Sequence, residues 1–173
     1  MTKRILITAA ATAAMLGQAS AHVTLETQEA KVGGSYKAVF RVGHGCEGAP
    51  TTTIRVRIPD GVISVKPMPK AGWEIATKTE AYGKTFDYYG TPLTEGVREV
   101  TWSGGNLPDA YYDEFVMRVY LTPDLATGGK LWFPVVQECP EGKAERWIEI
   151  PEAGKTADDY EYPAAGVTLL PKN

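Results

Sequence analysis

TTTIRVRI (residues 51–58) alternates polar and apolar side chains and places Ile54, Val56 and Ile58 on one face. Such alternation is typical of a β-strand that buries one face and exposes the other. YKAVFRV (residues 36–42) has the same alternation. The two segments therefore predict half-buried strands.

The β-type pattern returns along most of the chain, in short runs separated by turn-forming Gly, Pro and Asp residues. About seven to nine such runs predict an all-β fold, an immunoglobulin-like or fibronectin III-like β-sandwich. NLPDAYYD (residues 106–113) could form one turn of helix. The expected strands are residues 36–42, 51–58, 63–65, 73–79, 85–89, 98–102, 112–121, 131–136 and 146–150.

The composition is that of one globular domain. The chain has 173 residues, 43% hydrophobic and 23% charged, which excludes a disordered chain, a coiled coil and a collagen-like repeat. Its net charge of −3 lacks the basic surplus of nucleic-acid-binding proteins, so we expect no nucleic-acid partner. We expect a sandwich over residues 22–151. The β-pattern then fades, so residues 152–173 are expected to form a C-terminal strap or tail of the same domain.

Residues 1–21 have the pattern of a secretory signal peptide. Lys3 and Arg4 supply the positive start, residues 5–16 a short apolar stretch, and ASA (residues 19–21) a cleavage site. An uncleaved N-terminal anchor is the alternative, although the apolar run is short for a bilayer. We expect cleavage after Ala21 and a soluble periplasmic protein, a monomer or weak dimer without a membrane span in its mature chain.

The two cysteines, Cys46 and Cys139, are expected to form a disulfide, because a periplasm is oxidising. Closing so long a loop would stabilise the fold by about 4 kcal/mol in the chain-entropy model. A soft metal site built from both thiols is the alternative.

Cleavage after Ala21 would make His22 the first residue of the mature chain. Its α-amine and imidazole Nδ1 would then bind one metal ion together in a six-membered chelate ring. The amine titrates near ~8 and the imidazole near ~6.5, so both donate at neutral pH with little proton cost. Two such nitrogens with an oxygen ligand suit tetragonal Cu(II). The alternative is that signal peptidase merely tolerates a histidine here.

The remaining ligands must come from other parts of the chain. VGHGCEG (residues 42–48) places His44 and Glu47 beside one cysteine, and Glu138 adjoins the other. As alternatives, all three are ordinary surface side chains. Trp147 follows the second cysteine closely and is our candidate for a tryptophan beside the metal, where it would exclude solvent or carry oxidising equivalents. Most tryptophans in strand-like runs belong to a core instead.

Several segments resemble the YcnI-like copper-binding domain of bacteria, and together they extend over nearly all of the mature chain. The resemblance implies an immunoglobulin- or fibronectin-like sandwich that holds one Cu(II) per chain in a mono-histidine brace. There the first mature residue gives amine and imidazole, an acidic side chain completes the coordination, and a tryptophan lies nearby. His22 matches the first-residue ligand, and Glu47 lies in the loop that matches the acidic ligand's loop. The segments are AHVTLE (21–26), VGHGCEGAPTT (42–52), IPDGVISVKPMPKAGW (58–73), WSGGNLPDAYYDEF (102–115), FPVVQEC (133–139) and RWIEIP (146–151).

The sequence lacks the common catalytic motifs, G-x-S-x-G, the Walker loop, G-x-G-x-x-G and H-E-x-x-H. The function expected first is therefore a periplasmic Cu(II)-binding protein, not an enzyme, that captures copper for trafficking with other envelope copper-handling proteins. A second candidate is a copper-dependent oxidative enzyme resembling a lytic polysaccharide monooxygenase, in which His44 would be the second histidine. A third is a metal-free adhesion or scaffold sandwich.

Overall fold

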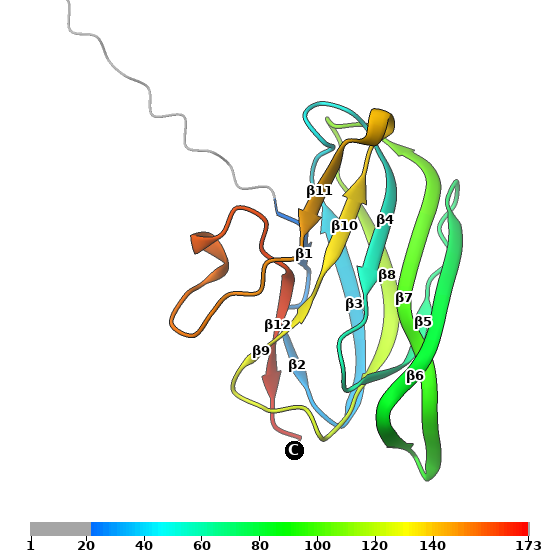
Figure 1. The fold of residues 1–173 in the computed structure, drawn as a ribbon, viewed down its shortest axis with the longest axis vertical. Helices are drawn as coiled ribbons and strands as arrows, with labels where there is room; N and C mark the ends of the chain where they lie inside the picture. Colours follow the sequence, from blue (N-terminus) through cyan, green and yellow to red (C-terminus); the bar gives the residue numbers. More distant parts are fainter. Residues whose placement is uncertain (1–21, 173) are drawn as a thin grey trace, which may run out of the picture.

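The computed structural model describes residues 22–172, which form an all-β domain (Figure 1). The expected signal peptide, residues 1–21, lies outside the described residues. The elements in chain order are β1 Thr24–Leu25, β2 Glu29–Lys31, β3 Gly34–Val42, β4 Thr51–Arg57, β5 Val62–Pro67, β6 Glu74–Tyr88, β7 Thr91–Leu107, β8 Asp113–Leu121, β9 Lys130–Phe133, β10 Val135–Glu138, the 3-10 turn Pro140–Gly142, β11 Ala144–Trp147, the 3-10 turn Ala157–Asp159 and β12 Ala165–Leu170.

Two sheets enclose the core. One has the order β1-β3-β8-β5 and the other β11-β10-β4-β7-β6, and a third small sheet has the order β2-β12-β9. Phe115 of β8 contacts Trp102 of β7 with ring centroids 5.7 Å apart, and both rings are fully buried. Aromatic contacts of this kind between the inner faces join the sheets. The predicted β-sandwich is therefore confirmed.

Strand β4 explains the alternation of polar and apolar residues in TTTIRVRI. It pairs with β7 on one side and β10 on the other, so it is an interior strand of its sheet. Ile54 and Val56 are 0% exposed, whereas Arg55 and Arg57 point to the outer face, where they pair with acidic side chains. The alternation in the sequence is the alternation of the two faces.

Several of the predicted strand boundaries differ from the structure. The expected strand 98–102 is only the middle of β7, and the run at 146–150 is a strand only as far as Trp147, where β11 ends. Residues 73–79 and 85–89 belong to one long strand, β6, whose register shifts between Ala81 and Phe86. The run at 131–136 is two strands, because Pro134 cannot donate a backbone hydrogen bond. The chain changes sheets there: β9 pairs with β12, and β10 pairs with β4. NLPDAYYD is no helix. Asn106 and Leu107 end β7, Asp113 begins β8, and the residues between them form a turn in which Tyr111 N–H donates to Pro108 O at 3.0 Å.

The C-terminal segment contains a strand that the sequence did not predict. β12 lies between β2, to which it is parallel, and β9, to which it is antiparallel. Its buried residues Ala165, Val167 and Leu169 alternate with partly exposed ones. Only residues 151–164, which we call the strap, form a projecting loop, drawn in orange to red beside the start of β1 in Figure 1.

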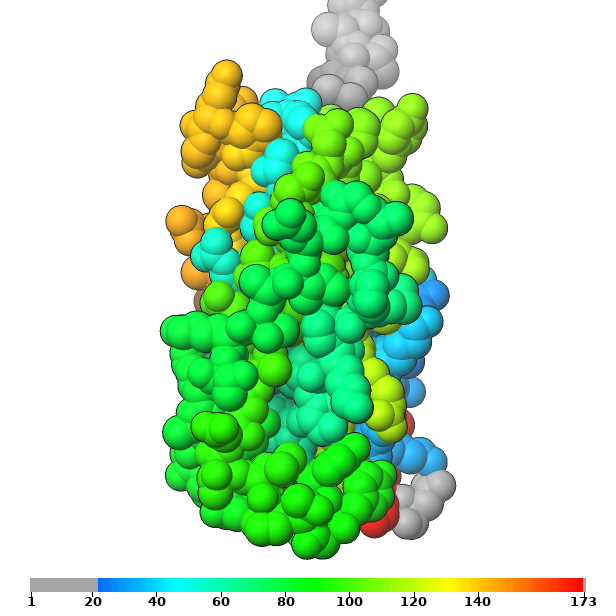
Figure 2. Space-filling model, turned by 90° about the vertical axis from the view of Figure 1, so that its right-hand side faces the viewer, coloured from blue at the N-terminus to red at the C-terminus, as the bar shows by residue number. Residues whose placement is uncertain are grey.

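The strap and the long hairpin formed by β6 and β7 lie on opposite sides of the molecule. β5, β6 and β7 cover the face shown in Figure 2, and the strap is on the other side in Figure 1. Within residues 22–172, no helix has the length and apolar character needed to cross a bilayer.

Candidate metal centre

His22 and His44 converge on Trp147. The antiparallel pairing of β1 with β3 sets Thr24 opposite Arg41, so the chain before β1 runs beside the loop that follows β3. The Trp147 ring centroid lies 5.6 Å from that of His22 and 6.0 Å from that of His44. The indole is 4% exposed, while both imidazoles are half-buried. Three of the residues singled out in the sequence therefore meet in one place.

The loop that carries His44 is held by several contacts. Gln137 Nε2 donates to His44 O at 2.6 Å, and Gly45 N–H donates to Asp109 Oδ1 at 2.9 Å. A Cβ on residue 45 would lie 1.8 Å from Ala49 O, so this position requires glycine. His44 Nδ1 contacts Gly45 O. Because a carbonyl only accepts, Nδ1 carries the proton, and Nε2 is the nitrogen with a lone pair for a metal.

The predicted disulfide is confirmed. Cys46 and Cys139 are bonded with their Cα atoms 6.1 Å apart, which ties the loop after β3 to the end of β10. No free cysteine remains among the described residues, so the alternative of a thiolate metal site does not apply.

Glu47 lies at the tip of a tight turn next to the disulfide. Cys46 and Ala49 exchange two backbone hydrogen bonds, and Glu47 and Gly48 between them have φ values of 50° and 82°. Two central residues with positive φ define a type I′ turn. The Glu47 side chain is 77% exposed, and its carboxylate pairs with Lys143 Nζ at 3.2 Å.

Glu138, the second acidic candidate, also has a cationic partner. It lies on β10, and its Oε1 accepts from Arg55 Nη2 at 2.7 Å. The contacts recorded for Glu138 thus join β10 to its neighbour β4.

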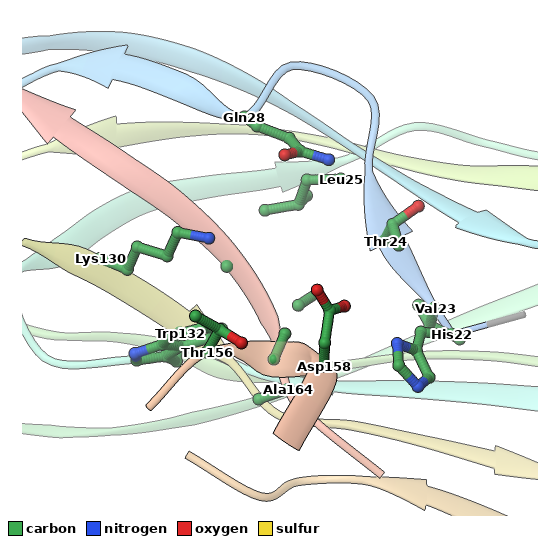
Figure 3. Close-up of a pocket in the computed structure, with 13 residues that line it drawn as sticks. His22, Val23, Thr24, Leu25, Gln28, Lys130, Trp132, Thr156, Asp158 and Ala164 are labelled. Carbon is green, nitrogen blue, oxygen red and sulfur yellow. The ribbon is translucent and has the colours of Figure 1, made fainter. Parts of the chain in front are cut away.

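Asp158, which the sequence did not indicate, lies near His22. Both residues line a pocket of about 300 Å³ that the start of the chain, β12 and the strap enclose. In Figure 3 the Asp158 carboxylate rises from the strap on the same side of this pocket as the His22 imidazole. A carboxylate in a polar loop has no distinctive pattern, so only the fold reveals its position.

Burial lowers the pKa of His22, in spite of the Asp158 carboxylate, which acts in the opposite direction; the nearby His44 adds to the lowering. The neutral imidazole is the form that binds metals. The environment of His22 thus favours the metal-binding form.

Gln137 is the second residue that sequence reasoning missed. It is 1% exposed, and its amide nitrogen donates to Thr51 Oγ1 at 2.7 Å as well as to His44 O. Its Oε1 accepts from Trp147 Nε1 at 3.0 Å. One side chain therefore positions both the indole and the histidine loop. The sequence signal that could have indicated this role is a glutamine within the apolar run FPVVQEC, since a polar side chain there needs hydrogen-bond partners.

Replacing Gln137 by leucine should lower the free energy of unfolding by about 2 kcal/mol, because the Trp147 N–H and the Thr51 hydroxyl lose a buried partner. The released indole should also change its near-ultraviolet circular dichroism. Urea unfolding and circular dichroism measure the two effects. The matched control is Gln28→Leu, whose exposed side chain should alter stability by less than about 0.5 kcal/mol. Equal stabilities for the two variants would contradict the role assigned to Gln137.

The side chains at this place provide too few donors for a metal ion, and the site fits one only if the terminal amine of His22 is added. No group of three or more His, Cys, Asp or Glu side chains in residues 22–172 is arranged to hold a metal ion. Two imidazoles are nevertheless close together, and one of them belongs to the residue that cleavage would expose. A terminal amine at His22 would add a third nitrogen donor.

The fold and the convergent side chains define an immunoglobulin-like β-sandwich with a histidine- and tryptophan-containing site near the expected mature N-terminus. The family model described as "Domain of unknown function (DUF1775)" matches residues 22–169. The chain belongs to this family, which is the YcnI-like family, so the family membership expected from the sequence is confirmed.

Among solved structures, the chain is similar to an uncharacterized protein from Nocardia farcinica, whose crystal structure is described as revealing an immunoglobulin-like fold. The two are 26% identical with a TM-score of 0.63, over 86% of this chain and 97% of the other. A DUF4466 family protein from Parabacteroides merdae is 12% identical, over 74% of this chain and 40% of its own, and its TM-score of 0.32 supports no argument. No curated protein matches the chain.

Proposed function

We propose that, after removal of the signal peptide, the protein binds one Cu(II) ion through His22 in the periplasm and passes copper to other envelope proteins. The observation that carries this proposal is the convergence of His22 and His44 on the buried indole of Trp147. Copper has no evident structural role here, because the sheets and the disulfide already hold the fold.

Each of the three residues has a distinct part in the proposed site. His22 would supply its amine and imidazole, and His44 would offer Nε2, since its Nδ1 faces the Gly45 carbonyl. A backbone partner of this kind fixes the tautomer and the orientation of a ligating imidazole. Trp147, held by Gln137, would close one side of the site against water. The bound copper ion would be the cargo, which the site can pass to a partner protein.

Half-buried imidazoles suit capture and transfer. A site that is partly open to solvent lets a partner approach the metal, whereas a closed set of four ligands retains it. The sparse set of protein donors supports trafficking rather than permanent storage.

The position of His44 also favours a second candidate function, a copper-dependent oxidative enzyme that acts on polysaccharides. Two imidazoles and a terminal amine are the nitrogen donors that such an enzyme would need. Incubation of copper-loaded protein with chitin or cellulose, ascorbate and hydrogen peroxide tests this candidate. Soluble oxidised oligosaccharides that disappear in His44→Ala would favour it over transfer.

The proposal predicts that Cu(II) raises the melting temperature of the processed protein. At one hundred times the dissociation constant, binding stabilises the folded state by about 2.7 kcal/mol, which corresponds to roughly 5 to 10 °C for a domain of this size. Differential scanning calorimetry of protein that begins at His22 measures the shift, and His22→Ala should show a much smaller one at the same copper concentration. An unchanged melting temperature would favour the metal-free scaffold instead.

A further inference from the structure

The strap brings a carboxylate to the proposed copper site from a part of the chain distant in sequence. His22 precedes β1, and Asp158 lies in the 3-10 turn Ala157–Asp159. Both line the pocket shown in Figure 3, where the labelled carboxylate and imidazole stand next to each other.

The local structure of the strap leaves the Asp158 carboxylate available. The neighbouring Asp159 is used within the turn, because its Oδ2 accepts from Thr156 N at 2.8 Å and from Thr156 Oγ1 at 3.1 Å. Asp158 is exposed, and no lysine or arginine of the described residues forms an ion pair with it. Glu47 and Glu138, by contrast, would each have to leave a cation before binding a metal.

The strap has few buried contacts, so a ligand bound at its tip can change how firmly it is held. None of the residues 152–162 is buried, and the contacts there are short-range, such as Lys155 with Glu152 at 4.0 Å. The segment is anchored near its end, where Tyr162 packs on Trp147 with ring centroids 5.4 Å apart. Segments with few buried contacts open locally at low cost in free energy.

We infer that Asp158 supplies the oxygen ligand to the metal ion held by His22, and that metal binding thereby fastens the strap to the start of β1. This inference rests on the proposed function. A carboxylate oxygen beside nitrogen donors is a set that Cu(II) accepts. The metal-free and metal-loaded forms then differ in the strap, which gives a partner protein a surface by which to distinguish them.

The test uses processed full-length protein, with Cu(II) as the ligand, and three isosteric variants. Asp158→Asn should weaken Cu(II) binding roughly 10- to 100-fold, the range seen when supporting groups of a metal site are removed. It should also change the copper electron paramagnetic resonance spectrum and abolish the copper-dependent slowing of hydrogen exchange in strap peptides. Glu161→Gln, which removes another exposed strap carboxylate, and Glu47→Gln should leave all three readouts as in the wild type.

The outcomes separate the inference from the proposal beneath it. Wild-type affinity, spectrum and strap protection in Asp158→Asn would overturn the role of Asp158 while copper binding stands. Loss of these signals in Glu47→Gln alone would assign the oxygen ligand to Glu47 and overturn the inference. If wild-type protein binds no Cu(II), both the proposed function and the inference fail.

Discussion

Replacing His22 by alanine in the processed protein should weaken Cu(II) binding by at least about 100-fold, or about 2.8 kcal/mol. The variant keeps its terminal amine but loses the imidazole, and with it the chelate ring in which both nitrogens bind one ion. Competition with a chromophoric Cu(II) chelator measures the affinity. The fold should be unaffected, because His22 lies before β1 and is only half-buried.

His44→Ala is the matched comparison, since it removes the other imidazole beside Trp147. We expect a smaller loss of affinity than for His22→Ala, because His44 would contribute a single donor. An undiminished affinity in His22→Ala would show that copper binds by other groups. An undiminished affinity in His44→Ala would remove the main support for the oxidative enzyme.

Replacing both Cys46 and Cys139 by alanine should lower the free energy of unfolding by about 4 kcal/mol. The bond closes a loop with a sequence separation of 93 residues, and a crosslink over such a loop strongly restricts the unfolded chain. Both cysteines are buried, and alanine is chosen because its side chain places no polar group in the interior. Urea unfolding followed by tryptophan fluorescence measures the change.

The same variant should bind Cu(II) more weakly, because the disulfide holds the turn that follows His44. Its effect on copper should be smaller than that of His22→Ala, which removes a ligand. Unfolding midpoints that agree between the variant and the wild type would contradict the stabilising role of the bond. A loss of stability with unchanged affinity would show that the histidine loop is held by Gln137 and Asp109 alone.

The fold could be predicted where local pattern and tertiary environment agree. β4 has a buried face and an outer face, and its sequence alternates accordingly. β12 has the same alternation in its burial, but it follows a polar loop and reads AGVTLL, in which glycine and threonine weaken the signal. The short strands β1 and β2 have two and three residues, too few for a period to appear.

The candidate site could be predicted only in part, because some of its residues have a local signal in the sequence and others are placed there only by the fold. His22 and the cysteines have chemistry that follows from the expected cleavage and from an oxidising compartment. His44 and Trp147 were indicated by their proximity to those cysteines in sequence. Asp158 and Gln137 lie at positions that only the fold reveals. Asp158 belongs to a strap that returns to the start of β1, and the buried amide of Gln137 joins the His44 loop to Trp147 of β11.

The central claim is that the amine and imidazole of His22 hold Cu(II) together. The most direct measurement compares the copper electron paramagnetic resonance spectra of processed protein and of the same protein with one alanine added before His22. The addition converts the amine into an amide and leaves every side chain in place. We predict a tetragonal spectrum with nitrogen coupling from both groups in the processed protein, and its loss with weaker binding in the extended one. Identical spectra and equal affinities would contradict the account.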